Sequence, residues 1–284
     1  MKQILLFLLL VFPFFGTASV FQQDLYINTG TQSYYGVNYN YTAFNSTPED
    51  TIRNYSLFFV EDVLELTVFN NDTVPHTPYI DNVQMDEQTL LPGESYTYII
   101  DFTGLEGTFR LYCSNAQGEM MGASTSILKG YENYDDYYVW NLFDQESGMD
   151  TLIMEGVISS FPVPGYKPDL FTINANSHPQ TLEDTLAKVM SNVGDSIVIS
   201  IVNSGKMSHT MHFHGYHITI LSAQIETMQV GWEKDTFNLK PGEAMTILLV
   251  PNQPGHYPVH NHNLLTVNTG GYPGGMITML EIMP

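Results

Sequence analysis

The segment SIVISIVN at residues 196–203 decides the fold class of this chain. It is a short run of β-branched residues ending in Asn203, and such residues favour extended strands over helices. Similar runs at 63–69, 95–102 and 245–250 are separated by segments containing Gly, Pro, Asn and Asp. No long stretch has the helical period. We therefore expect an all-β protein made of antiparallel sandwiches, and not an alternating α/β fold.

The same order of motifs occurs twice along the chain. In the second half, the segment 196–203 is followed by His209, the Pro-Gly-Glu turn at 241–243 and a Gly-containing segment at 254–257. The counterparts in the first half are 63–70, His76, 92–94 and 107–109. Two copies of one sandwich explain this repeat most simply.

The N-terminus has the pattern of a secretory signal peptide. Lys2 precedes the apolar run 4–15, and the small residues 16–18 follow it. We expect residues 1–18 to be removed and the protein to be secreted or periplasmic. The remaining length suits a first domain at 19–148 and a second at 149–284, with the boundary near the end of the Tyr- and Asp-rich segment 131–148.

Composition limits the partners. The chain has 30 acidic and 9 basic residues, for a formal charge of −21. Such a surface repels nucleic acid and anionic lipid. No segment beyond the N-terminus approaches the roughly 20 apolar residues of a membrane helix, so membrane insertion is not expected. Cys113 is the only cysteine and cannot form a disulfide within the chain.

Histidines cluster in the second half, where seven of the nine lie between 209 and 262. Side chains alternate between the two faces of a strand, so His212 and His214 lie on one face of their strand, and His260 and His262 likewise lie on one face of theirs. If the two strands are neighbours, four imidazoles converge, and neutral imidazole suits copper, zinc, iron or nickel. A single histidine on a strand usually has a structural role. Two His-x-His pairs in one domain favour a metal site.

The order of these motifs resembles the C-terminal domain of multicopper oxidases. The matching segments are 171–174, 194–195, 203–205, 209–215, 234–236, 241–243, 254–255, 260–262 and 275–276. The first half is similar to their plastocyanin-like N-terminal domain through Asn70, His76, 92–93, 107–109 and 118–122. The resemblance implies two tandem cupredoxin-like Greek-key β-sandwich domains and copper as the cofactor. It also implies a homotrimer, since two-domain members generally form trimers with copper between subunits.

In the family, the two His-x-His pairs of the last domain supply half the ligands of a three-copper cluster. The other half comes from two such pairs in an N-terminal domain, where this chain keeps His76 alone and has Cys113 in place of a pair. The family's blue-copper site requires a cysteine and a histidine where this chain has Asn261 and Thr266. His209 matches a remaining ligand. A complete three-copper cluster and a blue-copper centre are therefore not expected in the second domain.

The first domain offers a second candidate for a blue-copper site. Cys113 and Met121 have the spacing of a thiolate and an axial thioether, and His76 supplies one imidazole. The second imidazole is missing, because Ala116 and Gln117 occupy its place. The alternative is a buried free thiol that packs as a small apolar side chain.

Two functions follow from these motifs. The first is a copper-dependent oxidoreductase that lacks a complete blue-copper site and takes electrons from a small-molecule or protein donor. The second is a secreted or periplasmic protein that binds or sequesters copper ions without turnover. A sandwich that retains its histidines without a metal is a third possibility. The sequence has no nucleophile elbow, phosphate loop or zinc-protease helix.

Overall fold

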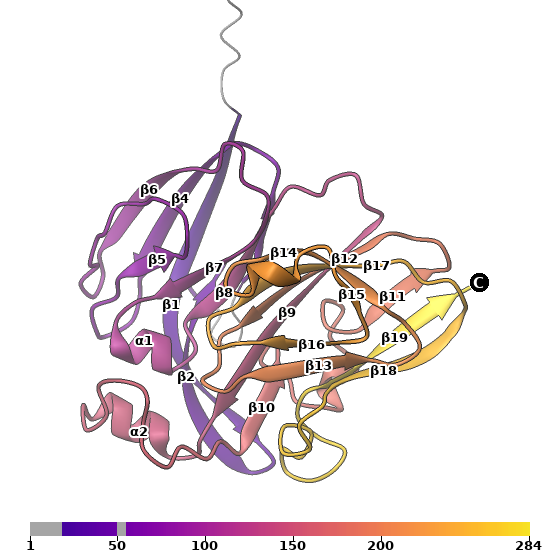
Figure 1. Ribbon diagram of the computed structural model, residues 1–284. Coiled ribbons are helices and arrows are strands. Elements are labelled where there is room, and N and C mark those ends of the chain that lie inside the picture. Colours follow the sequence, from indigo (N-terminus) through magenta and orange to yellow (C-terminus); the bar gives the residue numbers. More distant parts are fainter. Residues whose placement is uncertain (1–18, 50–54) are drawn as a thin grey trace, which may run out of the picture.

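The computed structural model describes residues 19–49 and 55–284, and it consists of two β-sandwiches side by side (Figure 1). The predicted signal peptide at 1–18 lies outside the described residues. One sheet of the first sandwich has the order β2-β1-β4-β6, and the other has the order β3-β8-β7-β5. Their bounds are β1 (Val20–Tyr34), β2 (Val37–Asn45), β3 (Leu57–Phe59), β4 (Val63–Asn70), β5 (Pro78–Ile80), β6 (Ser95–Asp101), β7 (Gly107–Cys113) and β8 (Ser124–Lys129).

The second sandwich pairs a six-stranded sheet, β10-β9-β12-β17-β14-β15, with a five-stranded sheet, β11-β19-β18-β13-β16. Its strands are β9 (Asp136–Gln145), β10 (Leu170–Ile173), β11 (Val189–Asn192), β12 (Ile197–Asn203), β13 (His209–Phe213), β14 (Ile218–Ala223), β15 (Glu233–Lys234), β16 (Thr236–Leu239), β17 (Ala244–Leu249), β18 (Gly255–Asn261) and β19 (Ile277–Met283). The helices are short: α1 (Ala116–Met120), α2 (Met149–Met154), η1 (Gln180–Leu182) and η2 (Thr227–Gln229). The prediction of an all-β chain is confirmed.

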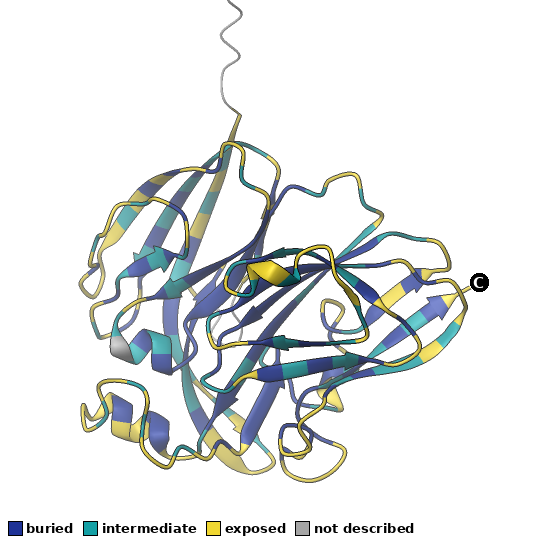
Figure 2. Cartoon of the chain, viewed as in Figure 1, coloured by how far each residue is buried: buried dark blue, intermediate teal, exposed yellow. Residues whose placement is uncertain are grey.

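The segment SIVISIVN forms β12, and all its residues from Ile197 to Asn203 are buried (Figure 2). One face packs in the core of the second sandwich, while the other contacts β7 of the first sandwich. At that contact the hydroxyl of Thr108 donates to Ser200 at 2.9 Å, and Thr108 and Thr246 are hydrogen-bonded at 2.8 Å. Burial on both faces explains why this strand is a continuous run instead of an apolar and polar alternation.

Strand pairing places the start of the second sandwich earlier than the sequence boundary at 148/149. β9 pairs in parallel with β12 and antiparallel with β10, so residues 136–145 belong to the second sandwich by hydrogen bonding. The Tyr- and Asp-rich composition of this segment resembles a linker. It nevertheless pairs with β10 and β12, which lie later in the sequence, and its composition carries no signal for such pairing.

A hairpin ties the two sandwiches together. β1 and β2 pair antiparallel, and the hairpin ends beside the second sandwich (Figure 1). The hydroxyl of Tyr34 donates to the carbonyl of Ala175 at 2.6 Å, and that of Tyr35 donates to the carbonyl of His178 at 2.6 Å. The two domains therefore share hydrogen bonds at this end as well as along β7 and β12.

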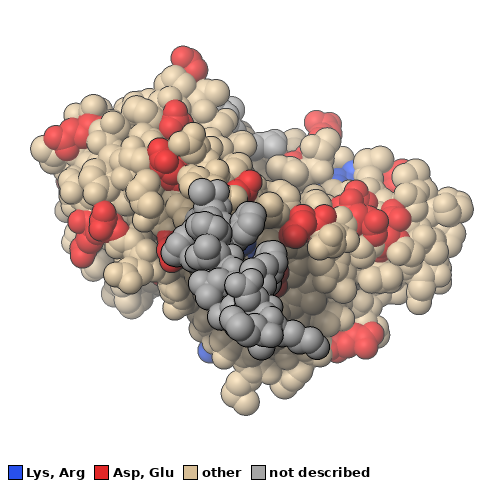
Figure 3. Space-filling view, turned by 90° about the horizontal axis from the view of Figure 1, so that it is seen from above, with Lys and Arg blue, Asp and Glu red and all other residues tan. Residues whose placement is uncertain are grey.

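The surface matches the composition. Acidic side chains are spread over the face seen from above, and few basic ones appear among them (Figure 3). Among the described residues, no helix combines the length and the apolar character needed to span a bilayer.

The internal repeat is visible in two equivalent asparagines. The Nδ2 of Asn70 donates to the carbonyls of Val74 and Leu90 at 2.8 and 2.9 Å. The Nδ2 of Asn203 likewise donates to the carbonyls of Met207 and Leu239 at 2.8 and 3.0 Å. In both cases Oδ1 accepts a backbone N–H two residues later at 2.9 Å. Each asparagine thus fixes the loop that leads to the histidine of its domain.

We predict that Asn203→Ala lowers the free energy of unfolding by about 2 kcal/mol or more, because it leaves buried backbone groups unpaired. Urea unfolding at neutral pH measures this change. Asn252→Ala, at an exposed asparagine, is the control and should change stability by less than about 0.5 kcal/mol. Equal effects of the two substitutions would contradict this role for Asn203.

Candidate metal centre

The four histidines of the two His-x-His pairs lie together on one face of the five-stranded sheet. β13 and β18 are antiparallel neighbours, and His212 is directly opposite His260. The backbone pairing continues beyond the strand ends, since His214 N donates to Pro258 O and His262 N donates to Thr210 O. The ring centroids of His212 lie 4.8, 5.7 and 5.5 Å from those of His214, His260 and His262.

Hydrogen bonds orient two of these rings. The Nδ1 of His260 is 2.9 Å from the carbonyl oxygen of Asn261, so Nδ1 carries the proton and Nε2 carries the lone pair. The Nδ1 of His212 bonds the hydroxyl of Thr236 at 2.7 Å. Fixing one nitrogen of an imidazole in this way prepares the other for a metal. The sequence analysis did not single out Thr236 as a partner, since only the pairing of β13 with β16 brings it beside His212.

The nitrogens of two rings meet directly. His214 Nε2 lies 3.0 Å from His260 Nε2, and because His260 presents a lone pair there, His214 is the donor. Burial lowers the pKa of His214 below its ordinary value, and the nearby rings of His212, His260 and His262 lower it further. A lowered pKa favours the neutral imidazole, which is the form that binds metals.

The cluster opens outward. His214 and His262 are exposed and His212 and His260 are half-buried, whereas Met211 and Phe213 between them are buried in the core. A hollow of about 330 Å³ adjoins the rings of His212 and His214. Within residues 19–49 and 55–284, no three His, Cys, Asp or Glu side chains have the arrangement of a preformed metal site. The four rings are therefore a convergent set of donors on the surface and not a closed coordination shell.

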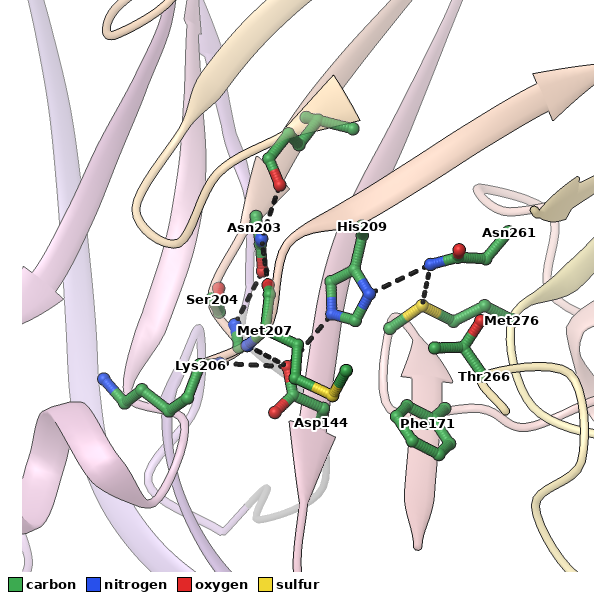
Figure 4. Close-up of polar contacts among 12 residues, drawn as sticks. Asp144, Phe171, Asn203, Ser204, Lys206, Met207, His209, Asn261, Thr266 and Met276 are labelled. Carbon is green, nitrogen blue, oxygen red and sulfur yellow. Dashed lines mark hydrogen bonds and ion pairs between the residues drawn. The ribbon is translucent and has the colours of Figure 1, made fainter. Parts of the chain in front are cut away.

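His209 does not join the cluster. It is fully buried, with its Nε2 3.0 Å from Asp144 Oδ2 and its Nδ1 accepting a hydrogen bond from Asn261 Nδ2 at 2.9 Å (Figure 4). The same Nδ2 lies 3.5 Å from the sulfur of Met276. Both ring nitrogens are thus occupied by protein groups, and the amide stands where a blue-copper site requires a thiolate. These residues do not fit a copper ion at this position.

Asp144 is a buried partner that sequence analysis missed. Its Oδ2 accepts the backbone N–H groups of Lys206 and Met207 at 2.9 and 3.1 Å, and its Oδ1 accepts the hydroxyl of Tyr166 at 2.6 Å. Burial alone would raise the pKa of Asp144, but the hydrogen bond and charge of His209, together with Tyr166 and Met207, lower it. The residue lies in the segment that looked like a linker, so no sequence signal marked it.

Of the candidates in the first domain, His76 and Cys113 lie near one another, and Met121 is also buried. Both His76 and Cys113 are fully buried, and Pro78, two residues after His76, pairs with Cys113 across β5 and β7. Met121 belongs to a separate apolar cluster with Met120, Met149 and Ile153.

We predict that Asp144→Asn lowers stability at pH 7 by about 1.5–3 kcal/mol, because a charged buried acceptor is lost. A carboxylate whose pKa is lowered by folding stabilises the protein above its unfolded pKa of about 3.9, and this contribution is lost as the pH falls through the folded pKa. The difference between wild type and variant should therefore shrink between pH 7 and pH 3. Urea unfolding at both pH values measures it, with the exposed Asp24→Asn as the control. A constant difference would rule out this linkage.

The chain is similar to known proteins both in the sequence pattern of its second domain and in its fold. Residues 162–273 match the multicopper oxidase family model. The fold is similar to that of a multicopper oxidase called mgLAC, at 21% identity, a TM-score of 0.76 and coverage of 93% of this chain and 86% of that one. The blue copper oxidase from Nitrosomonas europaea is 22% identical, with a TM-score of 0.75 and coverage of 93% of this chain and 86% of that one. The copper nitrite reductase from Nitrosomonas europaea is 16% identical, with a TM-score of 0.70 and coverage of 93% of this chain and 94% of that one. No curated protein sequence matches the chain significantly. The chain thus has the two-domain cupredoxin-like fold of multicopper oxidases, and its second domain carries the sequence pattern of that family.

Proposed function

We propose that the protein binds copper through His212, His214, His260 and His262 and acts as a copper-dependent oxidoreductase without a complete blue-copper site. The observation that carries the proposal is the contact of two imidazole nitrogens, His214 Nε2 and His260 Nε2, at 3.0 Å within a cluster of four rings. Imidazole donors suit copper, and the family and the neighbours named above are copper proteins.

The chain's own residues hold the donors in place. The carbonyl of Asn261 keeps the proton of His260 on Nδ1, so its Nε2 presents a lone pair, which His214 bonds in the absence of metal and which an ion would take in its place. Thr236 of β16 bonds Nδ1 of His212, which leaves Nε2 of His212 on the side of the ring away from Thr236. Burial and the neighbouring rings lower the pKa of His214, which favours its neutral form. Copper, when bound, supplies one-electron oxidation and reduction at this surface.

Electrons reach such a site from outside the second domain. The position of an internal blue copper is closed by the hydrogen bonds of His209 with Asp144 and Asn261. An external small-molecule or protein donor is therefore part of the proposal. The exposed position of His214 and His262 supports direct access to the metal.

The open face of the cluster also supports assembly. Within the described residues, one chain offers four rings and no closed ligand shell. Further copies of the chain, as in a homotrimer, would cover this face and complete the ligand set. The N-terminal pattern at 1–18 supports export to the periplasm or the cell exterior, where such a protein would meet copper ions.

A second candidate function is copper binding without turnover. The observation that favours it is again the closed position around His209, because it removes an internal route for electrons. Oxygen uptake by the copper-loaded protein with ascorbate or a phenol distinguishes the two. Uptake above that of free copper supports the oxidoreductase, and its absence with full copper loading supports sequestration.

We predict that the double substitution His212→Ala and His260→Ala lowers copper affinity by more than the loss of a group that only orients a ligand. Loss of such an orienting group lowers metal affinity by about 10–100-fold. Isothermal titration and metal analysis of the purified protein measure the change. His256→Ala removes an exposed histidine from the far end of β18 and is the matched control. Unchanged copper binding in the double variant would reject the proposed site.

The orienting role of Thr236 gives a milder prediction. Thr236→Val keeps a β-branched side chain in β16 but removes the hydroxyl that bonds His212. Copper affinity should fall about 10–100-fold with the fold retained. Circular dichroism checks the fold, and the same titration checks affinity. An affinity equal to that of the wild type would show that His212 needs no orientation by Thr236.

A further inference from the structure

A hollow between the two sandwiches brings together two of the few basic side chains of this acidic chain. Its volume is about 500 Å³, which is within the range of sites that hold small molecules. Arg110 of β7 and Lys206, from the loop between β12 and β13, both line it. The chain has only nine basic residues and a formal charge of −21. Because such a surface repels anions in general, two cations beside one hollow mark the place where an anion would bind.

Arg110 is held so that one end of its guanidinium lies at the hollow. The side chain is 9% exposed, its Nε donates to Asp81 Oδ2 at 2.9 Å, and its flat face lies 3.8 Å from the ring centroid of Tyr112. The other end lies beside Gly242, since a Cβ built there would be 3.3 Å from Nη1. Gly242 lines the same hollow. Asp81 uses only the Nε proton, so the two amino groups of a rigid fork suit the two oxygens of a carboxylate.

Lys206 brings a second positive charge to the hollow. Its side chain is 9% exposed and extends away from His209 and Asp144 (Figure 4), and its Nζ donates to Glu119 Oε1 at 3.1 Å. Burial lowers the pKa of Lys206, whereas the carboxylates of Glu119 and Asp144 raise it. The positive charge of Arg110 lowers it further. The two cations therefore repel one another, and a bound anion would relieve this repulsion.

The carboxylates beside the hollow set the charge of the anion that fits. Asp81 and Glu119 each accept a hydrogen bond from one of the two cations, and an ammonium group has further N–H donors to offer. The two carboxylate side chains are 29% and 39% exposed, so water screens them more than it screens the cations. They nevertheless offset part of the positive charge. A ligand with one negative charge is therefore favoured over one with two.

One wall of the hollow is apolar. Met120 is buried and Phe161 is half-buried, and the ring of Phe161 packs edge-on against Tyr166 with 5.3 Å between the ring centroids. Three serines add hydroxyl groups to the lining: Ser114, Ser159 and Ser160. A small inorganic ion would leave the apolar wall uncovered. An organic acid would bury its apolar part there, which adds to its affinity.

We propose that Arg110 and Lys206 bind a small organic acid with a single carboxylate, whose apolar part lies against Phe161 and Met120. None of the residues that line the hollow belongs to the candidate metal ligands. The proposal therefore does not depend on copper binding or on the function proposed above.

The test uses the full chain without metal at low ionic strength, because salt screens charge interactions. Isothermal titration with benzoate as the probe should show one saturable site per chain. Benzamide has a similar shape and no charge, so it should bind at least about 10-fold more weakly. Inorganic phosphate lacks an apolar part and carries more negative charge, so it should also bind more weakly than benzoate.

Two variants test the cations separately. Lys206→Met keeps an unbranched side chain without its charge and should weaken benzoate binding at least about 10-fold. Arg110→Lys keeps the charge but removes the fork, and it should also weaken binding. Lys188→Met is the matched control, because Lys188 is likewise a partly buried lysine paired with a glutamate, Glu281, at 2.5 Å, and it does not line the hollow. It should bind benzoate as the wild type does.

Urea unfolding checks that each variant is folded. The inference is overturned if benzoate shows no saturable binding, or if benzamide or phosphate binds as tightly as benzoate. It is also overturned if folded Lys206→Met and Arg110→Lys chains both keep the affinity of the wild type. Copper titration of the same variants keeps the two proposals apart, because loss of benzoate binding with copper affinity unchanged concerns this hollow alone.

Discussion

The register of β13 against β18 is the constraint on which the candidate site depends. Because His212 stands opposite His260, both His-x-His pairs point to the same outer face, while Met211 and Phe213 fill the core. A slip of one residue would turn every side chain of a strand to the other face and bury the imidazoles. Core packing therefore specifies the positions of the four clustered imidazoles. The same apolar residues that stabilise the sandwich also assemble its surface chemistry.

The two sandwiches use one device in two ways. In each, the strand before the histidine-bearing loop ends in asparagine, and the buried histidine lies against a carboxylate, Asp72 in the first and Asp144 in the second. In the second sandwich an amide completes the hydrogen bonding of the ring, and the site becomes a structural element. In the first, none of the groups in residues 19–49 and 55–284 bonds the other ring nitrogen, Nδ1 of His76. A repeated fold can thus retain its geometry while its copies diverge in chemistry.

Features set by local pattern were predictable from the sequence, and features set by distant neighbours were not. The β-branched run of β12 and the alternation in the His-x-His pairs depend on the chain's own periodicity, which is why both were predicted. β9 pairs with strands far along the chain, so its Tyr- and Asp-rich sequence gave no sign of its place. Asp144 and Thr236 became visible only through tertiary contacts.

The hairpin of β1 and β2 has a consequence for motion. Tyr34 and Tyr35 donate hydrogen bonds into the second sandwich, while the first part of β1, from Val20 to Ile27, pairs with β4 of the first. A hinge rotation between the sandwiches would break these bonds together with the hydroxyl contacts at Thr108. These contacts therefore oppose a relative rotation of the two sandwiches. Access of ions and electron donors to the exposed imidazoles should therefore depend on nearby loops or on adjoining molecules, and not on closure of one sandwich over the other.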